Sequence, residues 1–112
     1  MIVCVPVKPS GEIDPRWGRA ARVAIVEVQD GQLVRWEEHE VGWDTLHDEG
    51  TEGGHHARVA RFLQEQQVEV IVAGHMGPPM AQMLERMGRE VHAGAVGDAG
   101  RAVLYATVGR ST

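Results

Sequence analysis

The sequence has few of the residues that build disulfides, thiolate clusters or large aromatic surfaces. Its 112 residues include one cysteine, one phenylalanine and one tyrosine. A single cysteine cannot close an intramolecular disulfide or supply a cluster site made of several thiolates. Because Cys4 stands in the apolar run Ile2-Val3-Cys4-Val5, we expect it to be an inert residue of the core.

Long hydrophobic runs and an excess of positive charge are also missing. No apolar stretch approaches the ~20 residues that a membrane-spanning helix needs, and Met1 leads into a strand-like run rather than a signal peptide. The formal net charge of −5 disfavours nonspecific binding to nucleic acids or anionic membranes. We therefore expect a cytoplasmic monomer or homodimer without nucleic-acid or membrane partners.

The bulk composition is ordinary for a globular protein. Hydrophobic residues make up 43% of the chain and charged residues 24%, which is too apolar for a disordered protein. A chain of 112 residues leaves no room for a second core. We therefore expect a single domain over residues 1–112.

The first half of the chain predicts a strand followed by a hairpin. Residues 2–7 form a short apolar run that predicts a buried strand, and a loop follows to about Arg19. Strand-like patterns over residues 22–28 and 33–41 flank Asp30-Gly31, a pair that favours a tight hairpin turn. Residues 42–54 show no helical or strand period and predict a long polar loop.

The second half predicts alternating helices and strands. Apolar spacing predicts one helix from His55 onward and another from Pro78 to Gly88, with strands at residues 69–73 and 90–93. After Asp98 the pattern favours a third helix, although residues 103–108 also have strand-like composition. Strand–helix–strand alternation requires parallel pairing. We therefore expect an α/β fold, with a mixed five-stranded sheet flanked by about three helices.

Three segments combine glycine with a cation or an imidazole where ligands of such sheets gather. Ligands bind outside the carboxyl ends of parallel strands, close to helix N-termini. The segments are Arg16-Trp17-Gly18-Arg19, the helix start Gly53-Gly54-His55-His56, and the turn Gly74-His75-Met76-Gly77-Pro78. They predict a site for an anion with affinity for metals, in which His55, His56 and His75 are the candidate metal ligands. The other candidate ligand-binding residues are Arg16, Trp17, Gly18, Arg19, Gly54, Gly74 and Gly77.

Each of these side chains also has a purely structural interpretation. Adjacent histidines at a helix start are often capping residues, and the two arginines Arg16 and Arg19 could pair with the acid-rich middle of the chain. Trp17 could cover a ligand or fill the end of the core, and we favour the core. His39 and His47 stand among acids and are interpreted as surface residues.

The same segments resemble the nitrogenase iron–molybdenum cofactor biosynthesis family, which includes NifX-type carriers and the C-terminal domain of NifB-type proteins. The similarity covers nearly the whole chain, including Trp17-Gly18-Arg19-Ala20 and the Gly-x-x-Gly-Pro turn at Gly74. It implies a ribonuclease H-like sheet of order 3-2-1-4-5 with an antiparallel second strand. It also implies non-catalytic binding or carriage of an iron–sulfur or molybdenum-containing cluster or its precursor, with a cofactor-assembly or acceptor protein as partner.

One position departs from the family pattern. Relatives commonly have histidine before the aromatic-Gly-Arg triplet, where this chain has Arg16. A guanidinium cannot donate a lone pair to a metal, so this contact is expected to be one of charge. The departure leaves open a second function, a small regulatory or protein-interaction domain that meets its partner through the acidic residues 42–54. A nuclease is disfavoured, because residues 2–7 lack the carboxylates that two-metal chemistry requires.

Overall fold

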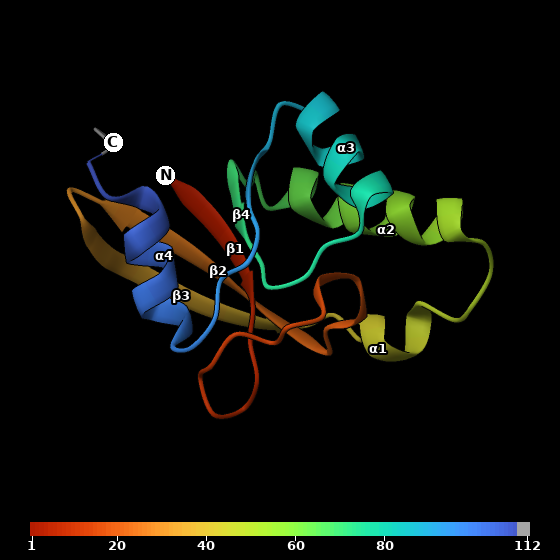
Figure 1. The fold of residues 1–112 in the computed structure, drawn as a ribbon, viewed down its shortest axis with the longest axis horizontal. Helices are drawn as coiled ribbons and strands as arrows, with labels where there is room; N and C mark the ends of the chain where they lie inside the picture. The colour runs from red at the N-terminus through yellow and green to blue at the C-terminus, as the bar shows by residue number, and fades with distance from the viewer. Residues whose placement is uncertain (110–112) are drawn as a thin grey trace.

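The computed structural model describes residues 1–109 and is built around one mixed sheet (Figure 1). β2 is antiparallel to both of its neighbours, whereas β1, β4 and β5 are parallel to one another. The expected α/β class, sheet order and antiparallel second strand are confirmed. The strands, in the spatial order β3-β2-β1-β4-β5, are β1 (Ile2–Pro6), β2 (Arg22–Gln29), β3 (Gln32–Glu40), β4 (Val70–Val72) and β5 (Glu90–His92).

Helices cover both faces of this sheet. Within residues 1–109 they are the 3-10 turn η1 (Trp17–Arg19) and the α-helices α1 (Trp43–Leu46), α2 (Glu52–Glu65), α3 (Pro78–Arg86) and α4 (Ala99–Thr107). α2 and α3 lie on one face, and α4 lies on the other (Figure 1). None of these described helices has the length and apolarity that crossing a bilayer requires.

The turn and cap residues explain where several elements begin. Asp30 and Gly31 both have positive φ, 52° and 75°, as a tight turn between β2 and β3 requires. Asp98 begins α4 by accepting a hydrogen bond from the Arg101 amide at 2.9 Å. The helix expected after Asp98 is therefore confirmed, and its strand alternative is wrong.

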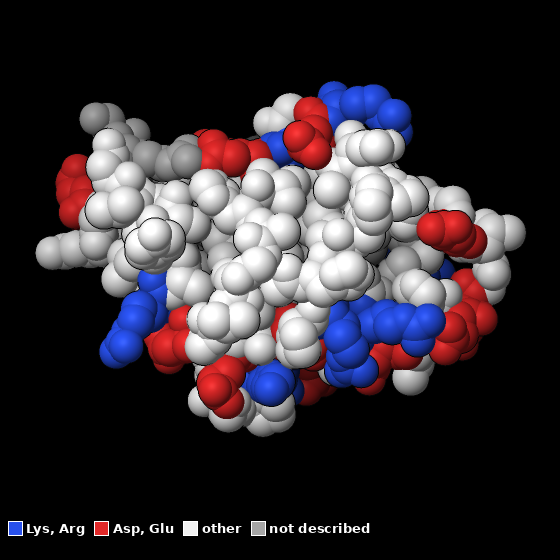
Figure 2. Space-filling model, in the orientation of Figure 1, with Lys and Arg blue, Asp and Glu red and all other residues white. Residues whose placement is uncertain are grey.

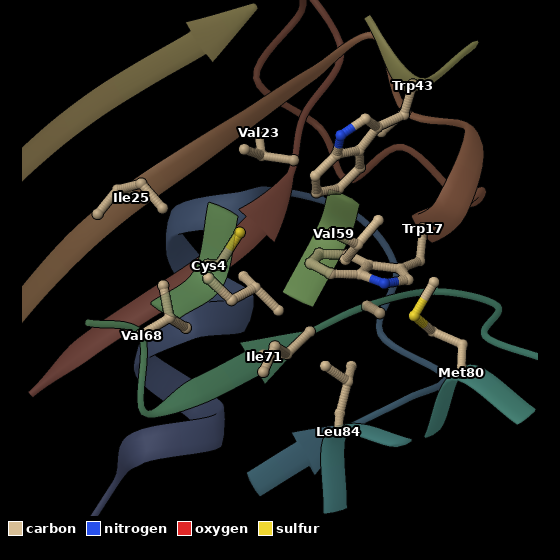
Figure 3. Packing of buried hydrophobic residues seen from close by; sticks show 13 residues of the cluster. Cys4, Trp17, Val23, Ile25, Trp43, Val59, Val68, Ile71, Met80 and Leu84 are labelled. Atoms are coloured by element: carbon tan, nitrogen blue, oxygen red, sulfur yellow. The ribbon is translucent and has the colours of Figure 1, made fainter. Parts of the chain in front are cut away.

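Strand residues alternate between two buried clusters. Cys4, Ile25 and Ile71 face α2 and α3 (Figure 3), whereas Val3 and Val26 face α4. The Cys4 side chain is fully buried, and this burial raises the pKa of its thiol. Cys4 is thus the inert core residue that the sequence predicts.

Residues 42–54 are not the long loop that the sequence pattern predicted. α1 begins at Trp43, whose side chain is buried, and α2 begins at Glu52, three residues earlier than expected. The Thr51 hydroxyl caps α2 by accepting a hydrogen bond from the Gly54 amide at 3.0 Å. The prediction failed because a four-residue helix is too short to show a period, and because two glycines in the first turn of α2 weaken its helical pattern.

Candidate functional site

The three predicted segments meet at the carboxyl ends of β1 and β4. The loop before η1 pairs with the turn before α3, because the His75 amide donates to the Pro15 carbonyl at 2.8 Å. In return the Trp17 amide donates to the His75 carbonyl at 3.3 Å. Arg16 and His75 therefore lie side by side in a parallel bridge that extends the β1–β4 pairing beyond the sheet.

These segments surround a cavity of about 240 Å³, here named the η1 cavity. Most of the predicted site residues line it, and five lining residues were not predicted. The predicted ones are Arg16, Trp17, Gly18, Arg19, His55, His56, His75 and Gly77. The unpredicted ones are His47, Glu52, Met76, Pro79 and Met80.

Two predicted glycines, Gly54 and Gly74, lie outside the wall of the cavity. A Cβ atom at Gly74 would lie 2.9 Å from the Cα atom of Pro15 and 3.2 Å from its oxygen. Glycine at position 74 is thus what allows the two loops to pair. A Cβ atom at Gly54 would lie 3.2 Å from the Thr51 hydroxyl that caps α2. Both glycines thus shape the segments around the cavity.

Both ring nitrogens of His55 have partners inside the protein. Nε2 lies 2.8 Å from the Gly18 carbonyl oxygen, and Nδ1 lies 2.8 Å from a guanidinium nitrogen of Arg58. A carbonyl only accepts and a guanidinium only donates, so Nε2 carries the proton and Nδ1 accepts. Burial, with a smaller contribution from nearby positive charge, lowers the pKa of His55. In this arrangement His55 links α2 to η1 and has no lone pair free for a metal.

The remaining imidazoles that line the cavity are those of His47, His56 and His75. His56 is half-buried, with Nε2 3.8 Å from a Glu52 carboxylate oxygen, whereas His75 is exposed. The half-buried ring of His47 packs edge-on against His55 at 5.0 Å. Among residues 1–109, no three His, Cys, Asp or Glu side chains are grouped closely enough to hold a metal ion. The described residues of the η1 cavity thus present imidazoles but no metal cage.

His47, interpreted as a surface residue among acids, is 33% exposed and pairs with Asp48 at 3.3 Å, and its ring also lines the η1 cavity. It directly follows α1, the helix that the sequence pattern did not reveal. His39, which was interpreted in the same way, is half-buried. The His39 ring packs on Phe62 of α2 at 5.5 Å and pairs with Glu37.

Arg16 and Arg19 bring two guanidinium groups to the cavity. Arg16 pairs with Asp14 at 3.3 Å, and Arg19 pairs with Asp48 at 3.5 Å. The two arginine side chains are 60% and 49% exposed, and such long, hydrated ion pairs contribute little to stability. Figure 2 shows basic side chains (blue) gathered over the η1 and α1 region, with acidic side chains (red) beside them. The Asp14 carboxylate is 8% exposed and binds Arg16 through two guanidinium nitrogens, whereas Asp48 is 69% exposed, so an incoming anion could displace Asp48 without leaving a buried charge unpaired.

Trp17 forms the inner end of the cavity and of the core. Its side chain is 1% exposed and packs edge-on against Trp43, with ring centroids 5.3 Å apart (Figure 3). The preference for a core position is therefore confirmed. Trp17 also touches the η1 cavity, so the two interpretations of this residue are compatible.

A larger cavity, of about 610 Å³, lies on the α4 side of the sheet and contains none of the predicted site residues. Small apolar residues of the β5–α4 connection and of α4 form most of its wall. Volume alone does not identify a binding site. The convergence of cations and imidazoles favours the η1 cavity instead.

Comparison with solved structures gives the same fold. The crystal structure of PH0822 matches with a TM-score of 0.75 and 17% identity, over 99% of this chain and 93% of that one. The apo form of the orange protein from Desulfovibrio gigas matches with a TM-score of 0.72 and 24% identity, over 93% and 83%. A putative NifB protein from Thermotoga (TM1290), assigned to the DUF35 family, matches with a TM-score of 0.67 and 22% identity, over 97% and 89%. At these identities the likeness shows the fold alone.

Comparison with whole families is more specific. No curated protein matches this chain. The profile described as dinitrogenase iron-molybdenum cofactor matches residues 1–107, nearly the full length. The resemblance carried by the η1 loop and the Gly74 turn is thereby confirmed, and the chain belongs to the dinitrogenase iron-molybdenum cofactor family.

Proposed function

We propose that this chain binds a preassembled, anionic iron–sulfur or molybdenum-containing cluster, or a precursor of one, in the η1 cavity and carries it without catalysing a reaction. The observation that supports this most is the meeting of three glycine-containing loops, with their arginines and imidazoles, around one cavity. Membership of the family supports the class of cargo.

The charges of the cavity favour an anion. Arg19 is held only by a weak, exposed ion pair and can turn toward a negatively charged ligand, whereas Arg16 stays paired with the buried Asp14 and can offer its remaining guanidinium N–H groups. The imidazoles of His56 and His75 add donors that hydrogen-bond to oxo or sulfido groups, or a lone pair for one metal atom. Arg16 thus offers a charge contact at the position where relatives commonly offer a histidine to a metal.

The lack of a metal-holding group of side chains within residues 1–109 favours a cargo that arrives assembled. A site that builds a cluster from free ions needs several ligands around each metal, and the described cavity residues do not provide such a group. Binding by charge and hydrogen bonds also allows release, which a carrier requires.

A carrier also needs a protein that supplies or accepts its cargo. The acidic side chains of residues 44–52 lie beside the cavity, because Asp48 pairs with Arg19 and the Glu52 carboxylate lines the wall. We place the contact with such a protein on this acidic segment. This assignment unites the carrier with the interaction domain that the sequence left open.

Anaerobic reconstitution tests the proposal. The purified chain is incubated anaerobically with preassembled anionic species, tetrathiomolybdate or a synthetic iron–sulfur cluster, freed of excess reagent, and examined by visible absorbance and elemental analysis. We expect a coloured complex whose yield falls several-fold in Arg19→Ala and in the double variant His56→Ala/His75→Ala. Arg61→Ala and His92→Ala provide matched controls, since neither residue lines the cavity, and they should retain the wild-type yield.

Two results would contradict carriage. One is a colourless, metal-free wild-type chain after reconstitution. The other is equal loss of colour in the cavity variants and in the controls. If the colourless chain still captured a partner protein, and neutralising residues 44–52 abolished that capture, the regulatory alternative would replace the carrier.

A further inference from the structure

One buried hydrogen-bond donor at the η1 cavity has no partner. The indole Nε1–H of Trp17 is inaccessible to solvent, and no acceptor within residues 1–109 lies in hydrogen-bonding position. Buried polar groups are nearly always hydrogen-bonded, so an unpaired donor requires an explanation. Trp17 lines the η1 cavity, whereas the other two buried atoms without a hydrogen bond belong to residues outside it. They are Arg89 Nε and His39 Nε2, and the latter still lies 3.0 Å from a Glu37 carboxylate oxygen.

The Trp17 ring is fixed in place, so the unpaired donor is preoriented. Edge-on packing against Trp43 at 5.3 Å, with an interplanar angle of 68°, holds the indole from one side. Its own backbone amide donates to the His75 carbonyl, which ties η1 to the turn before α3. The ring therefore cannot reach water or another acceptor without rearrangement of both loops.

A flexible side chain covers the indole N–H. In Figure 3 the Met80 thioether lies at the nitrogen edge of the Trp17 ring. The Met80 methyl also closes over η1, since a Cβ atom at Gly18 would lie 3.9 Å from it. Methionine changes rotamer at little cost, which makes it a suitable movable cover between this donor and the cavity.

The other buried ring N–H at the cavity, that of His55, already has an acceptor. His55 is as buried as Trp17, but its Nε2–H donates to the Gly18 carbonyl at 2.8 Å. Around the cavity, Arg16 and Arg19 favour a negatively charged ligand. An oxygen or sulfur atom of such a ligand is the acceptor that the indole lacks.

We infer that the Trp17 indole N–H donates a hydrogen bond to an oxo or sulfido atom of the anionic ligand, after the Met80 side chain has moved aside. This inference rests on the proposed function and assigns to Trp17 the selection of ligands with an acceptor atom at the inner end of the cavity. The arginines attract the anion, and the indole N–H favours ligands that place an acceptor atom at the inner end of the cavity.

Titration of the ¹⁵N-labelled chain tests the inference. The probes are molybdate, which presents oxo groups, and tetrathiomolybdate, which presents sulfido groups. The three indole N–H resonances, from Trp17, Trp36 and Trp43, are assigned with single Trp→Phe variants. We expect the Trp17 indole proton to move downfield together with the backbone amides of Gly18 and Gly77, while the Trp43 indole stays nearly unchanged.

Affinity measurements provide the second readout. Trp17→Phe keeps an aromatic ring and removes the donor, and should weaken binding of the preferred anion by about 10-fold or more, as expected for a hydrogen bond to a charged group. Trp43→Phe is the matched control, because Trp43 is equally buried in the same aromatic pair, and should change affinity by about 3-fold at most.

The outcomes separate this inference from the proposed function. If the Gly18 and Gly77 amides shift but the Trp17 indole does not, the hydrogen bond is refuted and carriage stands. Equal weakening by Trp17→Phe and Trp43→Phe would likewise show a packing effect and overturn the inference. If neither anion shifts any cavity resonance and reconstitution also fails, both the inference and the carrier function fall.

Discussion

The two faces of the sheet pack against different kinds of side chain. On the α4 face the buried cluster consists of valine, isoleucine and alanine side chains, nearly all from regular strands and one helix. On the α2 and α3 face the cluster contains two tryptophans and a methionine, and the buried His55 ring lies beside it. The tryptophans come from η1 and α1, which are short and irregular.

The two faces meet different packing requirements. The α4 face needs only aliphatic alternation along the strands, a pattern that regular secondary structure supplies. The opposite face must hold three loops in one arrangement, and large rigid rings with edge-on contacts provide that. The η1 cavity lies on this second face, where η1 and α1 each place a tryptophan ring in the core.

The largest expected effect is the loss of Trp43, which would break the aromatic face. Trp43→Ala removes a side chain that contacts the rings of Trp17, Phe62 and His55, and should lower the free energy of unfolding by about 3–5 kcal/mol. The counterpart on the α4 face is Val103→Ala, with an expected loss of about 2 kcal/mol. Urea unfolding measures both. Equal losses would show that the aromatic face is not the more sensitive one.

A smaller effect is expected where two loops meet without a side chain between them. In Gly74→Ala the new methyl would lie 2.9 Å from the Pro15 backbone, so the paired loops must separate. We expect a loss of about 1–3 kcal/mol in unfolding free energy, as for overpacked cores, and weaker binding of the probe anions. Gly53→Ala is the matched control, since nothing lies within 4 Å of its Cβ position in α2. That variant should be stabilised by up to about 1 kcal/mol. A stable Gly74→Ala chain with unchanged affinity would contradict the role given to this contact.

The same contrast explains how much of the fold followed from the sequence. β1 and β4 were predicted because each is a short apolar run, and the β2–β3 turn because Asp30-Gly31 has specific backbone requirements. α1 was missed, and with it the burial of Trp43, because four residues carry no period. Only tertiary contacts make that short helix stable.

The candidate site was likewise predicted only in part. Its location followed from strand order, since loops after parallel strands gather at one edge, and Arg16 and His75 indeed pair there. The roles of individual residues did not follow. Nothing local shows that both nitrogens of His55 are engaged, or that Gly74 faces Pro15 rather than a ligand. Both facts depend on contacts between residues far apart in the chain.

The smallest expected effect is the pH dependence of stability that the buried His55 imidazole gives to the α2 and α3 face. Burial lowers the pKa of His55 below its ordinary value of 6.5, so the folded state favours the neutral ring. The unfolded chain binds the proton first, and the stabilisation from neutral His55 is therefore complete above pH 6.5 and lost as the pH falls through the lowered folded-state pKa.

Protonation would place a proton on Nδ1, which now accepts from Arg58, and should loosen α2 from η1 before it affects α4. Relative to His55→Gln, the wild-type chain should lose up to about 1.4 kcal/mol of unfolding free energy per pH unit within this window. Hydrogen exchange locates the effect. We expect faster exchange at the amides of η1 and the first turns of α2 on acidification, with α4 unchanged. Uniform acceleration over both faces would show that acid does not act on the α2 and α3 face first. The same pH profile in His55→Gln would show that His55 is not the titrating group, because that variant lacks the imidazole.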